Sequence, residues 1–465
     1  MQTDAQPADV PAATWDALLA QQAEPTPFMR HAYLAALHAS GSAVAKTGWA
    51  PRFACLWDGD ELAAACPLYV KSHSYGEYVF DWAWARAYQE HGLAYYPKAL
   101  IAVPFTPVPG SRLLARDAAA RTALLQAVLG WCREHQLSSL HLLFGDAADL
   151  AACDAAGLMR RGQVQFHWEN LVPPRSAALP AALPPPEGAR PPWGGPAAGD
   201  LVPPRSVASP VALPRTGEGP PDMPGSGARP PWGGPAAGDL AGHEPDGSRR
   251  FASFDDFLAS LSQDKRKKIR QERRRVAEAG VRFRVAQGAD ISAEDWAFFY
   301  RCYERTYLEH GNPPYLKPAF FAAMARAMPE HWVMFIAEHE GTPIAASLIA
   351  VSGDPARAAG PKHSEPLVAY GRYWGALARV DRLHFEACYY QPIDWCIRHG
   401  VARFEGGAQG EHKMARALMP VKTESAHWLA HPAFADAVER FLAAEGEGVE
   451  GYLEHLAERS PFRQG

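Results

Sequence analysis

A segment in the middle of this chain separates it into two regions. Residues 171–248 contain 20 Pro and 13 Gly in 78 positions, almost half of the protein's 42 prolines. The segment also repeats itself, because ARPPWGGPAAGDL stands at both 189–201 and 228–240. Such a composition buries too little apolar surface to offset the entropy lost on ordering. We therefore expect a disordered, low-complexity insert; the alternative is a proline-rich docking site for a partner domain.

The regions on either side of the insert resemble each other. FACLWDGDELAAA at 53–65 aligns without gaps with FIAEHEGTPIAAS at 335–347, and each is typical of a strand, a tight turn and a second strand. WCREHQLSSL at 131–140 aligns in the same way with WCIRHGVARF at 395–404, and both resemble a helix end leading into a strand. Two matching segments in the same order indicate an internal duplication.

Charge and cysteine content exclude several classes of protein. A net charge of -5 and a pI near 6.4 give no global attraction to nucleic acid or anionic lipid. The N-terminus lacks a signal-peptide pattern, and no run of about 18 apolar residues occurs, so we expect a cytoplasmic protein without a transmembrane segment. The seven cysteines show no CxxC spacing, which favours reduced thiols.

Several common catalytic motifs are absent. The chain has no GxSxG elbow, no GxxxxGK phosphate loop, no GxGxxG after a strand and no HExxH. His384 and Glu386 have the HxE spacing of zinc deaminases, but the PCxxC segment that should follow is missing. We therefore expect no metal site.

Residues 369–422 form the segment richest in candidate site residues, and their pattern predicts local secondary structure. AYGRYWG at 369–375 predicts a strand, and 383–390 alternates so that its polar residues share one face if extended. Pro392 is tolerated in the first turn of a helix, so a helix is predicted over 391–399. A polar loop is expected to follow at 406–413.

HFEACYYQPIDWCIRHGVARFEGGAQGEHK at 384–413, together with AYGRYWG and the basic run QDKRKKIRQERRR, resembles the Fem-like branch of the GNAT acyltransferase superfamily. The resemblance implies an α/β fold of two tandem GNAT-like domains, at 14–170 and 251–465, separated by a disordered Pro/Gly-rich insert at 171–250. Members of that superfamily move an acyl group from acyl-CoA or aminoacyl-tRNA to an amine. The resemblance therefore implies a metal-free transferase with a small-molecule or peptide amine substrate, such as a peptidoglycan precursor, and with tRNA as a candidate partner.

Forming an amide needs a base for the attacking amine and hydrogen-bond donors for the oxyanion. The candidate bases are His384, Glu386 and Glu405. The candidate donors and substrate-binding groups are polar residues near these bases and aromatic residues of the first region: Arg372, Tyr373, the Gly406 and Gly407 backbone, His412, Lys413, Trp82, Trp84 and Tyr88. The alternative for each is structural hydrogen bonding or packing between domains.

A basic run suggests a place for an anionic donor. Residues 265–275 hold eight Lys or Arg in eleven positions, more than one helix face can carry. We expect Lys265, Arg266, Lys268 and Arg270 to bind phosphates of tRNA, CoA or a nucleotide-linked precursor. The alternative is a solvated helix with no ligand.

A second functional hypothesis is a non-catalytic binding or scaffold protein that keeps the duplicated fold and recognises cell-wall precursors. A pocket joining His384, Glu405 and Trp84 would favour the enzyme. A filled cleft would favour the scaffold.

Overall fold

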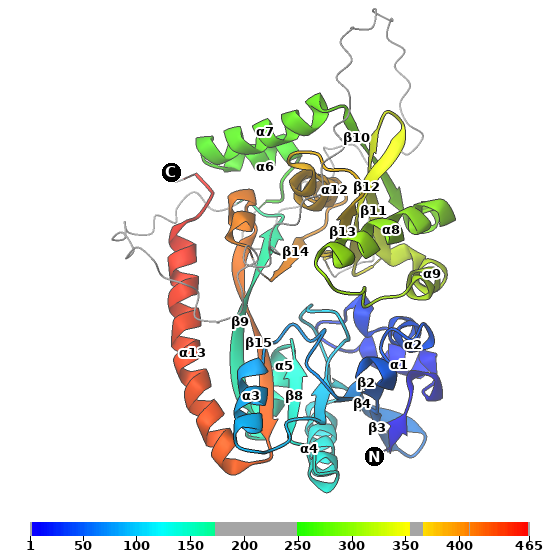
Figure 1. The fold of residues 1–465 in the computed structure, drawn as a ribbon, viewed down its shortest axis with the longest axis vertical. Coiled ribbons are helices and arrows are strands. Elements are labelled where there is room, and N and C mark those ends of the chain that lie inside the picture. Colours follow the sequence, from blue (N-terminus) through cyan, green and yellow to red (C-terminus); the bar gives the residue numbers. More distant parts are fainter. Residues whose placement is uncertain (1, 173–248, 354–365, 409, 464–465) are drawn as a thin grey trace, which may run out of the picture.

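The computed structural model describes residues 2–172, 249–353, 366–408 and 410–463 (Figure 1). The expectation of a disordered insert therefore falls almost wholly on residues outside those described. None of the described helices combines the length and the apolar composition that a membrane crossing requires.

The described strands form one large twisted sheet and one small sheet (Figure 1). The large sheet has eleven strands in the order β10 (Val281–Gln287), β11 (Trp332–His339), β12 (Thr342–Val351), β13 (Val368–Ala376), β14 (Arg403–Ala408), β9 (Met159–Glu169), β15 (Met419–Leu429), β8 (Ser139–Leu143), β6 (Lys98–Ile101), β5 (Leu68–Lys71) and β2 (Trp49–Pro51). The small sheet has the order β1 (Gln2–Ala5), β3 (Phe53–Asp58), β4 (Glu61–Cys66) and β7 (Leu114–Ala115).

Helices cover the sheets, and alternate residues of a strand enter different cores. On β11, Val333 and Phe335 join one core, whereas Met334 and Ile336 join another. The longer described helices are α1 (Ala12–Leu19), α2 (His31–Ala39), α3 (Trp82–Glu90), α4 (Ala118–Glu134), α5 (Ala147–Ala155), α6 (Phe254–Ser260), α7 (Gln263–Glu278), α8 (Ala293–Glu309), α9 (Pro318–Ala327), α12 (Gln391–Arg398) and α13 (Pro432–Glu458). The core on the side of α1, α2, α8 and α9 joins the two halves of the chain.

Both halves repeat the same arrangement, which confirms the duplication. In each, a hairpin precedes a pair of parallel strands, β6 with β8 and β13 with β14, and a helix leads into the second strand of the pair. In both copies, Nδ1 of the histidine at the end of that helix donates to a tryptophan carbonyl: His135 to Trp131 at 3.0 Å and His399 to Trp395 at 2.8 Å. The ring centroids of each pair are 4.4 and 4.2 Å apart.

The halves exchange their last strands. β9, the last described strand of the first half, pairs with β14 of the second, and β15 at the end of the second half pairs with β8 of the first. β9 and β15 also pair with each other in antiparallel register, so one continuous sheet runs through both halves. The division of the chain into domains at 14–170 and 251–465 stays a prediction.

One predicted element is wrong. Residues 383–390 are helical, not extended: α11 (Leu383–Phe385) passes into a π-helical segment (Glu386–Tyr390) that continues into α12. The side-chain hydroxyl of Ser347 donates to the Ala387 carbonyl at 2.5 Å, and Tyr389 and Tyr390 are buried. Packing against neighbouring elements thus overrides the alternating pattern, as tertiary contacts commonly do over short segments. The strand predicted at 369–375 is confirmed as β13.

Candidate functional site

Two neighbouring parallel strands diverge in the second half of the chain. β13 and β14 pair only from Val368 with Arg403 to Tyr370 with Glu405. Beyond that point β13 continues along β12, and β14 continues along β9. In α/β sheets, ligands commonly bind outside the carboxyl ends of strands, where neighbouring connections part. The divergence of β13 and β14 is therefore the natural place to look for a site.

Three polar residues share one rung across this divergence. Tyr370, Glu405 and His167 are register partners on β13, β14 and β9, so their side chains leave the same face of the sheet. The adjacent Phe404 and Trp168 enter the apolar core on the opposite face. The nearest polar atoms of Glu405 and His167, Oε2 and Nε2, are 4.0 Å apart.

The Glu405 carboxyl is the most unusual group of the rung. It is 3% exposed, its Oε1 atom lies 2.9 Å from the Arg403 guanidinium, and its Oε2 atom has no hydrogen-bond partner among the described residues. Burial raises the pKa of Glu405 to about 7, against the opposing effect of Arg403. Burial and the nearby Arg403 lower the pKa of His167 to about 3, so its imidazole is neutral. A carboxyl of this kind can take up or release a proton near neutral pH.

A loop of the first half lies over this face of the sheet. The Gln165 amide, two residues before His167 on β9, donates to the Pro107 carbonyl at 2.9 Å. Arg372, two residues beyond Tyr370 on β13, donates to the Phe105 carbonyl at 3.0 Å. The rung is thus placed between the two halves of the chain.

The predicted substrate-binding residues near this rung are partly engaged. Arg372 donates to the Tyr373 hydroxyl at 2.9 Å. The Gly406 and Gly407 carbonyls accept from the Lys413 ammonium at 2.7 and 3.2 Å, and so does Ala408 at 2.9 Å. Burial lowers the pKa of Lys413 to about 8. The Lys413 ammonium therefore stabilises the end of β14, and its hydrogen bonds are used within the protein.

The other two predicted bases lie in a different cluster. Glu386 is buried, with its carboxylate 3.1 Å from Arg273 of α7 and 2.7 Å from the Gln391 amide, and burial raises its pKa. The ring of His384 packs 5.7 Å from that of Tyr389, and the hydroxyl of Tyr389 lies 3.3 Å from Nε2 of His412.

This cluster lies on the opposite side of the sheet from Glu405. α7 shares a core with Phe404, whose side chain points away from the rung, and Glu386 pairs with α7. His384 also lines a pocket with Trp374, Arg305 and Arg379, and Glu405 is not among the residues of that pocket. The structure therefore does not bring the three predicted bases together.

The predicted basic helix exists as α7 and has an inner and an outer face. Ile269, Glu272 and Val276 are buried. Arg273 and Arg275 form ion pairs with acidic residues of the second half. Lys268 and Arg270 are exposed, Lys265 and Arg266 are half-buried, and of these four only Arg270 lies near a described carboxylate, 3.8 Å from Asp255. The outward cations remain available to a ligand.

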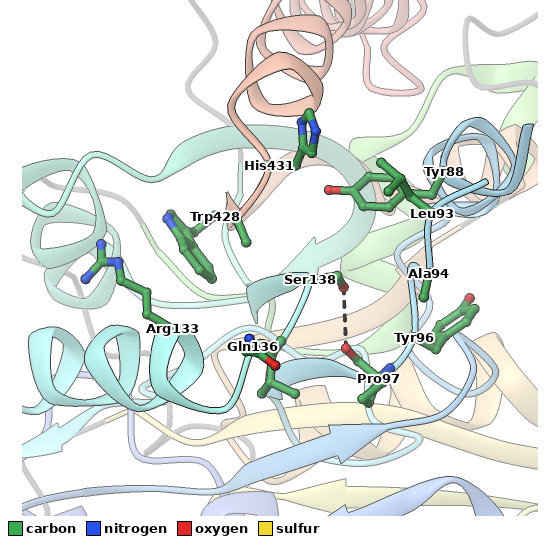
Figure 2. Close-up of a pocket in the computed structure, with 12 residues that line it drawn as sticks. Tyr88, Leu93, Ala94, Tyr96, Pro97, Arg133, Gln136, Ser138, Trp428 and His431 are labelled. Atoms are coloured by element: carbon green, nitrogen blue, oxygen red, sulfur yellow. Dashed lines mark hydrogen bonds between the residues drawn. The ribbon is translucent and has the colours of Figure 1, made fainter. Parts of the chain in front are cut away.

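The aromatic residues predicted near the substrate lie elsewhere. Trp84 is buried, with its ring 5.1 Å from that of His427 on β15. Tyr88 lines a pocket together with Trp428 and Arg133 (Figure 2). Trp82 is exposed on α3. Trp84 and Tyr88 therefore lie beside β15, and the ring of Trp82 lies 5.0 Å from that of Tyr75, so the structure does not group these residues with Glu405.

The sequence matches the model of the FemAB-like family, described as peptidoglycan biosynthesis/recognition, over residues 6–172 and 247–464. The chain belongs to the FemAB-like family. It has a mixed α/β fold of two similar halves, as the resemblance implied.

Solved structures similar to this FemAB-like protein have low sequence identity. FemX has 9% identity and a TM-score of 0.47, with 92% of this chain and 98% of FemX covered. L-PGS from Bacillus licheniformis has 10% identity and a TM-score of 0.44, with coverages of 93% and 97%. A tandem GNAT protein from the clavulanic acid biosynthesis pathway has 11% identity and a TM-score of 0.40, with coverages of 90% and 95%. No curated protein sequence matches the chain.

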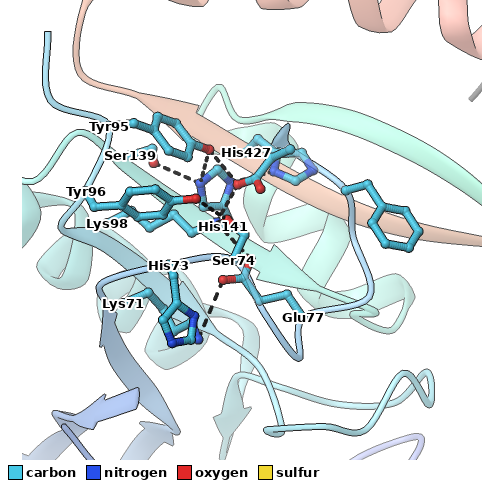
Figure 3. A network of polar contacts seen from close by, with 12 residues as sticks. Lys71, His73, Ser74, Glu77, Tyr95, Tyr96, Lys98, Ser139, His141 and His427 are labelled. Carbon is cyan, nitrogen blue, oxygen red and sulfur yellow. Dashed lines mark hydrogen bonds and ion pairs between the residues drawn. The ribbon is translucent and has the colours of Figure 1, made fainter. Parts of the chain in front are cut away.

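The FemAB-like protein also contains a buried polar network that the sequence analysis missed (Figure 3). The Lys98 ammonium, fully buried on β6, lies 2.8 Å from the Glu77 carboxylate and also binds Asp81. On the neighbouring strands, His141 and His427 are register partners, and their Nδ1 atoms are 2.7 Å apart. The sequence does contain a signal for this network, because Lys98 and His141 are isolated polar residues in short apolar strands.

This network occupies the position in the first half that the Glu405 rung occupies in the second. The alignment of the two tryptophan-cysteine segments places His141 over Glu405, and both residues stand on the second strand of a parallel pair. The exchanged strands then supply the partner, His427 for His141 and His167 for Glu405. Among the described residues, no group of His, Cys, Asp and Glu is arranged to hold a metal ion.

Proposed function

We propose that this FemAB-like protein is an N-acyltransferase that moves an acyl or aminoacyl group from acyl-CoA or aminoacyl-tRNA to an amine acceptor such as a peptidoglycan precursor. The observation that carries the proposal is the Glu405 carboxyl. It is buried at the divergence of β13 and β14, one of its oxygens has no hydrogen-bond partner among the described residues, and its pKa is raised to about 7 by burial. Such a group is suited to general base catalysis at neutral pH.

In the proposed reaction the acceptor nitrogen attacks the donor carbonyl carbon and forms the new C–N bond. Glu405 takes the proton that the nitrogen loses. The tetrahedral intermediate then breaks its bond to the CoA sulfur or to the ribose oxygen of tRNA, and the proton passes to that leaving group. The Tyr373 hydroxyl, which accepts from Arg372 at 2.9 Å, is the candidate donor to the oxyanion.

The donor's phosphates are assigned to the outer face of α7. Lys265, Arg266, Lys268 and Arg270 concentrate positive charge there, and a cluster of this kind attracts the phosphates of CoA or tRNA. His384 and His412, on the same side of the sheet, are candidates to contact the donor rather than to act as the base.

The test is a transfer assay on the full chain. Labelled acetyl-CoA and a set of labelled aminoacyl-tRNAs are each offered with a lysine-containing peptide, and the modified peptide is detected by mass spectrometry. Transfer from either donor that is lost in Glu405→Gln supports the proposal. Failure of both donors to bind or react would contradict it.

The alternative is a non-catalytic protein that recognises cell-wall precursors. One observation favours it: Lys413 is saturated by three backbone carbonyls, so the end of β14 is fixed rather than open. Binding of a precursor without transfer from any donor would favour this alternative.

A further inference from the structure

Arg372 is a cation surrounded by neutral partners. Its Nη2 atom donates to the Phe105 carbonyl at 3.0 Å, the Thr106 hydroxyl at 3.2 Å and the Tyr373 hydroxyl at 2.9 Å. Its guanidinium carbon lies 4.9 Å from the ring centroids of both Phe28 and Tyr373. No Asp or Glu in the described part of the chain forms an ion pair with it.

Two buried arginines of this chain, Arg161 and Arg416, have acidic partners. Arg161 forms two hydrogen bonds of 2.8 Å with the Glu445 carboxylate, and Arg416 binds Glu272 at 2.7 Å. The guanidinium of Arg112 donates to the Leu143 and Gly110 carbonyls, and its backbone N–H donates to the Asp149 carboxylate. Removing a guanidinium from water is costly unless an anion compensates its charge. Among the described residues, Arg372 therefore lacks the carboxylate partner that Arg161 and Arg416 have.

The guanidinium retains unused donors. Its Nε atom is buried without a hydrogen-bond partner, and no hydrogen bond of Nη1 occurs among the described residues. Hydroxyl groups stand beside it, because Tyr33 shares the Thr106 hydroxyl with Arg372 at 3.2 Å and Tyr373 accepts from Arg372 directly. A planar set of N–H donors flanked by hydroxyls matches the oxygen atoms of a carboxylate.

We propose that Arg372 binds a carboxylate of the amine acceptor and so orients the amine toward Glu405. This inference rests on the proposed transfer function. Arg372 and Tyr370 lie on one side of β13, because both contact Phe28: its ring centroid is 5.2 Å from that of Tyr370 and 4.9 Å from the Arg372 guanidinium carbon. Tyr370 is the register partner of Glu405. The carboxylate site and the proposed base therefore lie on one face of the sheet.

The position of α7 assigns this carboxylate to the acceptor rather than the donor. α7 packs through Ile269 into the core that contains Phe404, on the opposite face from Glu405. The exposed cations that suit donor phosphates thus lie on the other side of the sheet from Arg372. Donor and acceptor would reach the divergence of β13 and β14 from opposite faces.

The test measures binding of the full chain to two probes, the dipeptide lysyl-alanine and its C-terminal amide, by isothermal titration calorimetry. The wild type is expected to bind the free acid at least about tenfold more tightly, because a charge-assisted pair with arginine is lost in the amide. Arg372→Gln should reduce this preference to less than about twofold, because the charge-assisted pair with the carboxylate can no longer form. Arg282→Gln, which changes an exposed arginine of β10, is the matched control and should keep it.

Arg372→Lys keeps the positive charge and is expected to show an intermediate preference, which covers the case in which Arg372→Gln does not fold. Equal binding of acid and amide by the wild type, or no binding of either, overturns the inference. So does a full preference in folded Arg372→Gln. Glu405→Gln should retain the preference while losing transfer. A preference present in a protein that accepts no donor would overturn the transferase proposal and leave the carboxylate site standing.

Discussion

His167 and His427 occupy equivalent positions in the two halves of the protein. Each is followed by a tryptophan and stands near the end of one of the two exchanged strands. His167 is the register partner of Glu405, whereas His427 is the register partner of His141. The duplication thus provides a carboxyl and an imidazole in one half and two imidazoles in the other. Only the first pair offers a buried acid that titrates near neutral pH.

Replacing Glu405 tests its role as the base. Glu405→Gln keeps the size of the side chain and removes the proton acceptor, so kcat/KM for transfer should fall by roughly 10² to 10⁴. In the wild type, kcat/KM should rise with pH up to about 7 and then level off, because burial raises the pKa of this carboxyl to about 7 and only its ionised form accepts a proton. A pH series of the transfer assay measures both effects.

Glu386→Gln is the matched control for this experiment. Glu386 is also buried and its pKa is also raised, but it is paired with Arg273 on the other side of the sheet. Its replacement should leave the inflection near pH 7 in place. An inflection that disappears in Glu386→Gln and survives in Glu405→Gln would reassign the base.

Lys98→Met should destabilise the protein strongly. The Lys98 ammonium lies between the carboxylates of Glu77 and Asp81, all of them buried, so its removal leaves the buried Asp81 carboxylate without its ion-pair partner and leaves Glu77 with Lys71 alone. A loss of about 3 to 5 kcal/mol in the free energy of unfolding is expected. Urea denaturation measures it. Lys46→Met, at an exposed position, should change stability by less than about 0.5 kcal/mol.

The paired histidines should make stability fall in acid. Burial lowers the pKa of His141 to about 3 and that of His427 well below its usual range. Below about pH 6.5 the unfolded chain therefore binds more protons than the folded chain, and the free energy of unfolding decreases as pH falls. Between pH 7 and 5, His427→Gln should lose roughly 2 kcal/mol less than the wild type.

Denaturation curves at the two pH values give this difference. His431→Gln makes the same substitution at an exposed histidine and serves as the control. Identical pH dependence in wild type and His427→Gln would show that the buried pair does not contribute.

Charge reversal on α7 tests the donor site. Lys268→Glu combined with Arg270→Glu should raise the Kd for deacylated tRNA or CoA at least about tenfold and flatten its salt dependence, because each neutralised phosphate releases counterions. The melting temperature should hardly change, because both side chains are exposed. Arg274→Glu is the control on the same helix, because the Arg274 guanidinium lies 3.4 Å from the Glu278 carboxylate. Normal binding with lowered thermal stability would make α7 a structural helix.

Local sequence patterns predicted several elements of this fold. The matching hairpins, the two tryptophan-cysteine segments and the strand at 369–375 rest on short-range periodicity and turn residues, which a sequence displays directly. His-Trp pairs stand at 167–168 and 427–428 in the sequence, but only the exchanged strands show that the two pairs are equivalent.

The tertiary structure decided which polar residues meet. Glu405 acquires His167 from a strand of the other half, while Glu386, close to it in sequence, turns toward α7 because residues 383–390 fold as a helix. Trp84, predicted near the substrate, packs instead beside His427. The sequence by itself determined the duplicated elements, the basic helix and the residue types available for catalysis. The register between distant strands and the resulting burial set the pKa of Glu405 and left Arg372 without a carboxylate partner in the described part of the chain, because these properties depend on long-range packing that no local pattern encodes.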